Sequence, residues 1–128
     1  MGKTRMRDTV ILSIKPEYAQ RIFEGFKKYE FRKKAFSDKV RRVIVYVTMP
    51  VGMVIGEFYV DGIDIGSPRE IWTRCRRSAG ISKKAFFDYY KRSSVAVAIR
   101  IQRVDQYPNP VRISDFCKSP PQSFCYLQ

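Results

Sequence analysis

Apolar and polar residues alternate with two different periods along the chain, and these periods predict its elements. The β-branched, apolar run over residues 9–14 predicts a buried strand that ends just before Pro16. Pro16 suits the first turn of a helix, and apolar residues recur every four positions after it. We therefore predict an amphipathic helix over residues 16–25, with Gly25 at its end.

A series of strands is predicted for the middle of the chain. Residues 28–32 alternate between aromatic and charged side chains, which predicts a strand with one polar face. The apolar run over residues 43–47 is typical of a strand that is covered on both faces, and a strand is predicted over residues 42–48. After a Pro-Val-Gly turn, residues 53–61 predict another strand, in which Gly56 is a candidate β-bulge.

A capping signal marks the start of a helical region. Ser67 can cap a helix, Pro68 suits its first position, and Glu70 completes a capping box. This signal predicts a helix over residues 68–78. A second short helix is expected over residues 82–91.

Strand-like patterns return toward the C-terminus. Residues 94–104 predict a long strand, and shorter extended pieces are expected over residues 111–113 and 120–127. This order of elements fits a mixed α/β fold with a curled, barrel-like sheet and helices at its ends. The length fits one domain over residues 1–128.

Net charge is the most unusual property of the composition. The chain has 25 Lys and Arg residues against 12 Asp and Glu residues, which gives a net charge of +13. Residues 1–42 carry +8 and residues 67–92 carry +6, whereas residues 43–66 carry −3. Such an excess attracts polyanions, nucleic acid first and an anionic membrane surface second. The simpler alternative is a solvated basic surface that keeps the protein soluble.

Several kinds of site are poorly supported. The cysteines, Cys75, Cys117 and Cys125, lack Cys-x-x-Cys spacing, and the chain has no histidine. We therefore expect no disulfide scaffold, no metal, no other cofactor and no histidine-based catalysis. No apolar stretch is long enough to span a membrane, and no apolar leader follows the N-terminus. The sequence predicts a cytoplasmic protein without a membrane partner.

Charged residues cluster at the end of the first predicted strand and along the second. The cations are Lys15, Lys27, Lys28 and Arg32. A carboxylate at Glu30 among them could orient Arg32 and accept a hydrogen bond from a base amino group. The remaining cations would then be available for phosphate. The alternative is a solvated charged strand face.

Hydrolysis would need Lys or Glu as the base, with water or a hydroxyl as nucleophile. The hydroxyl candidates are Ser13, Thr48 and Ser123.

Residues 11–32 resemble the opening of the ASCH family, which belongs to the PUA-like superfamily together with RNA-binding PUA and modified-base-reading YTH and EVE domains. The hallmark is a strand and a helix followed by Gly-x-Lys, here Gly25 and Lys27, and then a charged strand. Gly-Glu-Phe at 56–58, the Ser-Pro helix start and Pro-Pro-Gln-Ser-Phe at 120–124 are similar to a prokaryotic and phage branch.

The resemblance implies a PUA-like pseudo β-barrel whose cleft binds RNA or a nucleotide, including a modified nucleoside, in transcription-linked or RNA-linked regulation. Some members are N4-acetylcytidine amidohydrolases and others are ribonucleases. The amidohydrolase motif matches Lys27, but Glu30 replaces its Thr. Two interpretations stay open: a binding module, and a hydrolase that uses Lys27 and Glu30.

We predict two groups of binding residues. The ligand cleft is expected to include Lys15, Tyr29, Glu30, Arg32, Gln122, Ser123 and Tyr126. Nucleic-acid contacts are expected from Lys28, Lys33, Lys34, Arg74, Arg76 and Arg77.

Overall fold

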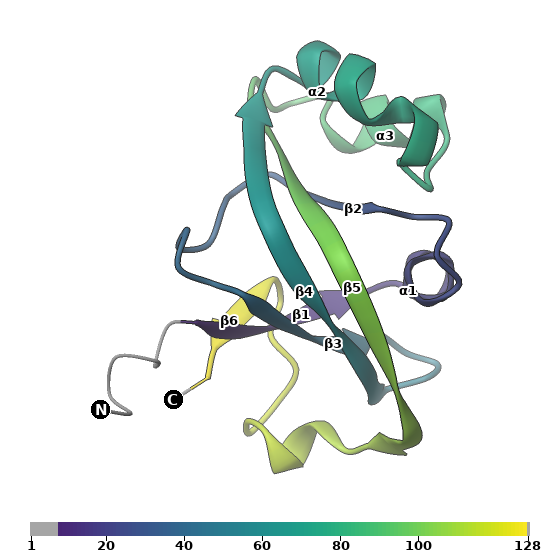
Figure 1. Cartoon of the computed structure of the whole chain (residues 1–128), viewed down its shortest axis with the longest axis vertical. Helices are drawn as coiled ribbons and strands as arrows, with labels where there is room; N and C mark the ends of the chain where they lie inside the picture. Colours follow the sequence, from purple (N-terminus) through teal and green to yellow (C-terminus); the bar gives the residue numbers. More distant parts are fainter. Residues whose placement is uncertain (1–7, 128) are drawn as a thin grey trace.

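The computed structural model describes residues 8–127, and within them six strands form one sheet in the order β2-β5-β4-β3-β1-β6 (Figure 1). The strands are β1 (Thr9–Ile14), β2 (Tyr29–Arg32), β3 (Arg42–Val47), β4 (Met53–Gly66), β5 (Ala96–Val111) and β6 (Phe124–Tyr126). The helices are α1 (Pro16–Phe23), α2 (Pro68–Cys75) and α3 (Lys83–Tyr89), with short 3₁₀ turns η2 (Arg76–Ser78) and η3 (Ile113–Asp115).

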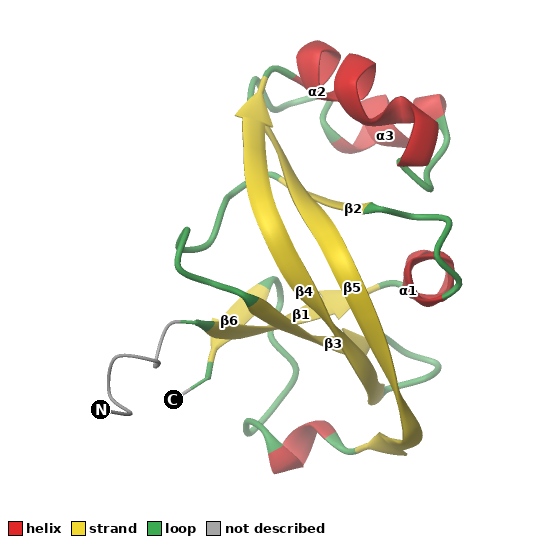
Figure 2. Ribbon diagram, viewed as in Figure 1, coloured by secondary structure: helices red, strands yellow, loops and turns green. Residues whose placement is uncertain are grey.

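Two long antiparallel strands, β4 and β5, run the length of the molecule (Figure 2). Helices α2 and α3 lie at one end of this pair, and the β1, β3 and β6 strands cross its other end (Figure 2). The β1–β3 pair is parallel and the other pairs are antiparallel. Strands β1 and β2 do not pair, although the curled sheet brings their ends to a common cavity. The predicted mixed α/β fold with a curled sheet is confirmed.

The core lies on both faces of the central strands. On β1, Leu12 faces the cluster beneath α1, whereas Ile11 faces a cluster covered by η3 and the C-terminal segment. On β3, Val45 and Ile44 divide in the same way. All four side chains are fully buried. This explains why β1 and β3 are continuous apolar runs rather than alternating ones.

Local signals in the sequence set where the helices begin. Pro16 occupies the first turn of α1, and the chain leaves that helix through Gly25, whose φ is +88°. At α2, the Ser67 hydroxyl accepts from the Glu70 backbone N–H at 3.1 Å, and the Glu70 carboxylate accepts from the Ser67 N–H at 2.8 Å. The predicted capping box is therefore confirmed. At α3, the Ser82 hydroxyl accepts from the Ala85 N–H at 3.1 Å, without a reciprocal side-chain bond.

Several predicted boundaries were wrong. The helices predicted at 16–25 and 82–91 are shorter by a few residues, while α2 and η2 together fill 68–78. Strands β4 and β5 extend to residues 66 and 111, well past the predicted ends, because they pair with each other from Gly66 and Ala96 to Val54 and Val111, with register shifts between. The strand predicted at 111–113 does not form, since β5 includes residue 111 and η3 begins at residue 113.

The predicted bulge at Gly56 has a clear structural reason. The register between β4 and β5 shifts between Val54 and Gly56. A Cβ atom on Gly56 would lie 2.7 Å from the Asp105 carbonyl oxygen and 2.7 Å from the Phe23 ring. Only glycine lets β5 and α1 approach this strand so closely.

Candidate functional site

A cavity of about 630 Å³ opens where the end of β1 faces β2. Its wall combines apolar and aromatic side chains with several polar groups, a composition that suits an amphipathic ligand such as a nucleobase. The cavity lies at the gap between two strands that do not pair. Its lining residues are Ser13, Ile14, Lys15, Tyr18, Glu30, Phe31, Arg32, Thr48, Ile81, Ala85, Asp88, Tyr89 and Gln122.

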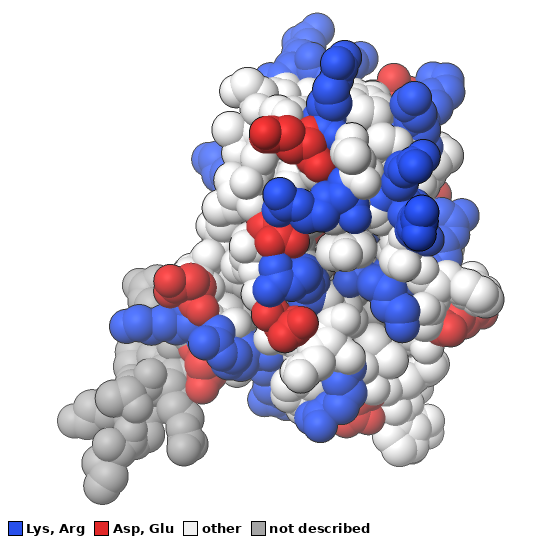
Figure 3. Space-filling model, turned by 45° about the horizontal axis from the view of Figure 1, so that its top comes forward, with Lys and Arg blue, Asp and Glu red and all other residues white. Residues whose placement is uncertain are grey.

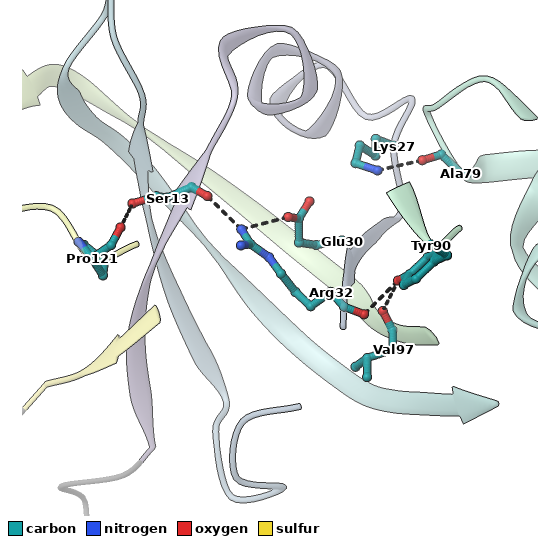
Figure 4. Close-up of polar contacts among 8 residues, drawn as sticks. All are labelled: Ser13, Lys27, Glu30, Arg32, Ala79, Tyr90, Val97 and Pro121. Carbon is teal, nitrogen blue, oxygen red and sulfur yellow. Dashed lines mark hydrogen bonds and ion pairs between the residues drawn. The ribbon is translucent and has the colours of Figure 1, made fainter. Parts of the chain in front are cut away.

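Arg32 bridges this gap. Its Nη2 donates to the Ser13 carbonyl oxygen at 2.7 Å and lies 3.0 Å from Glu30 Oε2 (Figure 4). Both charged side chains are mostly buried, with exposed fractions of 13% for Arg32 and 9% for Glu30. The Arg32 Nε is buried and makes no hydrogen bond to residues 8–127. The ion pair therefore fixes the position of the Glu30 carboxylate in the cavity wall, and the hydrogen bond from Arg32 to Ser13 links β2 to β1.

The C-terminal segment is attached to β1 through Ser13. The Ser13 hydroxyl donates to the Pro121 carbonyl oxygen at 2.6 Å, and the Ser13 N–H donates to the Ser123 carbonyl oxygen at 3.3 Å. These two bonds place Gln122 between the anchored residues, where it lines the cavity. A neutral amide at this point offers both donors and an acceptor to a ligand.

Helix α3 forms the opposite wall. The Tyr90 hydroxyl donates to the backbone carbonyl oxygen of Arg32 at 2.7 Å, which fixes the end of α3 against β2 (Figure 4). Tyr89 lines the cavity, and the Lys33 ammonium lies 4.8 Å from the centre of its ring. Burial raises the pKa of Tyr89, so its hydroxyl stays neutral at physiological pH.

Lys27 lies behind the cavity wall. It is only 3% exposed, and its Nζ donates to the Ala79 carbonyl oxygen at 2.8 Å (Figure 4). The same Nζ lies 5.3 Å from the ring centre of Tyr18 and 4.6 Å from that of Phe31, two residues of the wall. Burial lowers the pKa of Lys27 to about 8, against the opposing effect of the Glu30 carboxylate. Lys27 thus combines a perturbed pKa with a position outside the cavity lining.

The structure brings together part of the predicted cleft. Lys15, Glu30, Arg32 and Gln122 line one cavity although they come from three separate segments. The other predicted residues are placed elsewhere, and the lining does not include them. They are Tyr29, Ser123 and Tyr126.

These three residues have structural contacts. The Tyr29 ring stacks with Phe31 at 6.1 Å between centroids and packs against the core beneath α2 and α3. The Tyr126 hydroxyl accepts from the Ser37 N–H at 2.9 Å. Ser123 accepts from Ser13 through its backbone carbonyl. Tyr29 shares a face of β2 with Phe31, but its ring packs against the core beneath α2 and α3 and does not line the cavity.

The predicted nucleic-acid contacts lie on the surface in two areas. The exposed lysines Lys28, Lys33 and Lys34 lie just before and just after β2. The three predicted arginines lie on α2 and η2, at an end of the molecule where Lys and Arg side chains gather (Figure 3). They are Arg74, Arg76 and Arg77.

Sequence reasoning missed the contribution of α3 and its preceding loop. Ile81, Ala85, Asp88 and Tyr89 line the cavity but are far from β1 and β2 in the chain. No local spacing links these segments, and only the packing of α3 on β2 brings them together. Tyr18 also lines the cavity, as an aromatic residue on the apolar side of α1.

Comparison with known proteins identifies the family. The model of the ASCH domain matches residues 12–105, which contain most of the cavity lining. The chain belongs to the ASCH domain family. The resemblance and the PUA-like fold predicted from the sequence are thereby confirmed.

Relatives of this ASCH domain carry varied names. This chain is 34% identical over 123 residues to the large ribosomal subunit protein uL22 of Ureaplasma parvum serovar 3. The matched region covers 94% of this chain but only 40% of that protein's length. It is 30% identical to an ASCH domain-containing ribonuclease of Zymomonas mobilis over 95% of this chain and 86% of the relative. The crystal structure of an ASCH protein from Zymomonas mobilis superposes with a TM-score of 0.86 at 29% identity, covering 95% of this chain and 89% of the other.

The described residues contain neither a metal-binding cluster nor a helix that could span a membrane. Among residues 8–127 there is no group of three or more Cys, Asp or Glu side chains that could hold a metal ion. Over the same range, every helix is too short or too polar to cross a membrane.

Proposed function

We propose that this ASCH domain binds single-stranded RNA, with one base, unmodified or modified, in the cavity between β1 and β2. The observation that carries the proposal is the cavity itself, whose volume of about 630 Å³ lies within the usual range for small-ligand pockets. Aromatic side chains, Tyr18 and Phe31, supply apolar surface for a base. The Glu30 carboxylate and the Gln122 amide supply groups that match the donors and acceptors of a base edge.

The charges around the cavity favour a nucleotide over an uncharged ligand. Lys15 is exposed at the rim, and Lys33 lies over Tyr89 on the opposite wall. Within the wall, Arg32 is already paired with Glu30. The rim cations are therefore the groups available for phosphate, while the Arg32–Glu30 pair offers a fixed carboxylate to the base. The proposal includes a cytoplasmic location and a role in transcription-linked or RNA-linked regulation.

Blocking the cavity tests this proposal. Ala85 lines the cavity from α3, so Ala85→Phe should fill part of the space without changing the net charge. We expect fluorescence anisotropy of labelled single-stranded RNA to report at least a tenfold loss of affinity. The matched control is Ala35→Phe, at an exposed residue that does not line the cavity. Equal affinity for the two variants would contradict the proposed site.

RNA cleavage is a second candidate function, and one observation favours it. The relative named as a ribonuclease matches 95% of this chain and is itself covered over 86% of its length. Lys27 has a pKa near 8 and could exchange a proton near neutral pH, but its Nζ is bound to the Ala79 carbonyl behind the wall. The Glu30 carboxylate lies in the wall and is paired with Arg32. We therefore rank binding above cleavage.

Turnover separates the two functions. The protein is incubated with labelled RNA and, separately, with N4-acetylcytidine, and the products are followed over time. Binding without any product is the expected result. Product formation that is lost in both Lys27→Met and Glu30→Gln, with both variants still folded by circular dichroism, would assign hydrolysis to this domain.

A further inference from the structure

A second pocket, of about 440 Å³, lies at the end of the molecule built by α2 and α3. Its lining comes from the middle of α2, from the η2 turn and from the first residue of α3. Figure 3 shows Lys and Arg side chains gathered over this end of the molecule. The pocket is lined by Trp72, Arg76, Arg77 and Lys83, and it contains no carboxylate.

The positive charges of this pocket are not neutralised within the protein. Among residues 8–127, no ion pair involves Arg76, Arg77 or Lys83. The next residue along α3 differs, since Lys84 pairs with Asp88 at 2.9 Å. Like charges that converge without a counterion repel one another, and a bound anion removes that repulsion. The pocket is therefore suited to anions.

An aromatic ring completes the pocket. Trp72 is held from one side by Phe86 and Phe87, with ring centroids 5.0 and 6.1 Å away. It remains only partly buried and lines the pocket beside the cations. An aromatic ring next to unpaired cations is the combination by which proteins bind single-stranded nucleic acids, because bases stack on the ring and phosphates contact the cations.

The same short helix contributes to both sites. Ala85 and Tyr89 of α3 line the cavity between β1 and β2, whereas Lys83 at the start of α3 lines the second pocket. We propose that the second pocket is a further RNA subsite, in which a base stacks on Trp72 and the neighbouring phosphates contact Arg76 and Arg77. This inference rests on the proposed function and extends it, because it defines the course of the strand from the cavity across the start of α3.

Trp72 provides a direct test, because it is the only tryptophan in the chain. Its fluorescence is measured while a mononucleotide and oligouridylates of increasing length are added. Anisotropy of the same labelled oligonucleotides reports binding independently of Trp72. We expect the emission to be quenched by oligonucleotides long enough to reach both sites, and Trp72→Leu to weaken their binding about tenfold. The mononucleotide in the cavity should leave the emission unchanged.

A matched pair of charge variants isolates the pocket. Arg76→Gln combined with Arg77→Gln removes two of its cations, whereas Arg69→Gln combined with Lys91→Gln removes the same charge from residues that line neither site. We expect the first pair to lower affinity about tenfold more than the second. It should also reduce the slope of log affinity against log salt concentration by about 1.4, which corresponds to two phosphate contacts on a single strand.

The outcomes separate this inference from the proposed function. RNA binding in the anisotropy assay that Ala85→Phe weakens supports the cavity site. If Trp72 emission then stays constant and the two double variants lose equal affinity, the second subsite is wrong and the cavity site stands. If no RNA binds in the anisotropy assay, the proposed function fails and the second subsite fails with it.

Discussion

The buried carboxylate of Glu57 allows a quantitative prediction about stability. Glu57 is only 4% exposed, on β4, and its Oε1 accepts hydrogen bonds from Arg42 at 2.8 Å and from the Tyr107 hydroxyl at 2.5 Å. Its Oε2 accepts from Arg42 Nε at 3.1 Å and from the Tyr59 hydroxyl. Four donors therefore surround one carboxylate, and the ionised form, whose two oxygens only accept, suits all four at once.

The pKa of Glu57 gives the size of the effect. Burial alone would raise this pKa, but the hydrogen bonds from Arg42, Tyr107 and Tyr59 outweigh burial and lower it from 4.5 to about 2. At about 1.4 kcal/mol for each pKa unit, the ionised form contributes on the order of 3 kcal/mol to the folded state. Because the folded pKa is the lower one, this contribution is present above pH 4.5 and is lost as the pH falls toward 2.

Glu57→Gln is the corresponding substitution. The amide has one oxygen where the carboxylate has two, and its NH₂ group would face donors rather than acceptors. We expect the free energy of unfolding at pH 7 to fall by about 3 kcal/mol, measured by urea denaturation followed by circular dichroism. The difference between wild type and variant should shrink at lower pH, as the wild-type carboxylate becomes protonated.

Asp88→Asn is the matched control for this experiment. Its side chain is 62% exposed, so solvent screens its charge, and Asp88→Asn should leave the free energy of unfolding almost unchanged. The reasoning would be refuted if Glu57→Gln were as stable as this control at pH 7. A loss of stability that stays constant from pH 7 to pH 3 would also refute it, because then the charge of Glu57 would not be its cause.

Three other predictions use different parts of the structure. Burial lowers the pKa of Lys27 from 10.5 to about 8, so between these pH values the unfolded state keeps the ammonium proton that the folded state has lost. The free energy of unfolding of wild type, relative to that of Lys27→Met, should therefore rise by about 2 kcal/mol between pH 8 and 10, measured by urea denaturation. Gly56→Ala should lower the melting temperature through a loss of about 1–3 kcal/mol, because the new Cβ would meet Phe23 and the β5 backbone at 2.7 Å; an unchanged melting temperature would contradict the close packing at the bulge. Asp88→Asn should raise RNA affinity about twofold in the anisotropy assay, because it removes a carboxylate from the cavity wall, and weaker binding would argue against phosphate near this wall.

The local signals in the sequence were sufficient to locate most elements of this protein. Pro16 fixes the start of α1, and the reciprocal bonds of Ser67 and Glu70 fix the start of α2. The apolar runs correctly predicted a buried strand at β1 and a strand covered on both faces at β3. These features depend on neighbouring residues alone, so a single sequence contains them.

The ends of β4 and β5 were decided by tertiary structure. Residues 105–111 are polar and rich in proline, a composition that does not predict a strand. They are nevertheless extended, because β4 pairs with them, as the contacts of Gly56 with Gln106 and of Val54 with Val111 show. Every residue except proline has a backbone donor and an acceptor, so pairing with a distant strand leaves little trace in the side-chain pattern.

For the candidate site too, the sequence determined one part and the tertiary structure the other. The sequence indicated Lys15, Glu30 and Arg32 as a charged group, and Gln122 as a polar residue near the C-terminus. Only the fold shows that the Ser13 hydrogen bonds carry Gln122 to the cavity, and that α3 forms the opposite wall. Chain distance has no fixed relation to spatial distance once a sheet curls. The sequence therefore determined which residues have suitable chemistry, and the curvature of the sheet decided which of them meet.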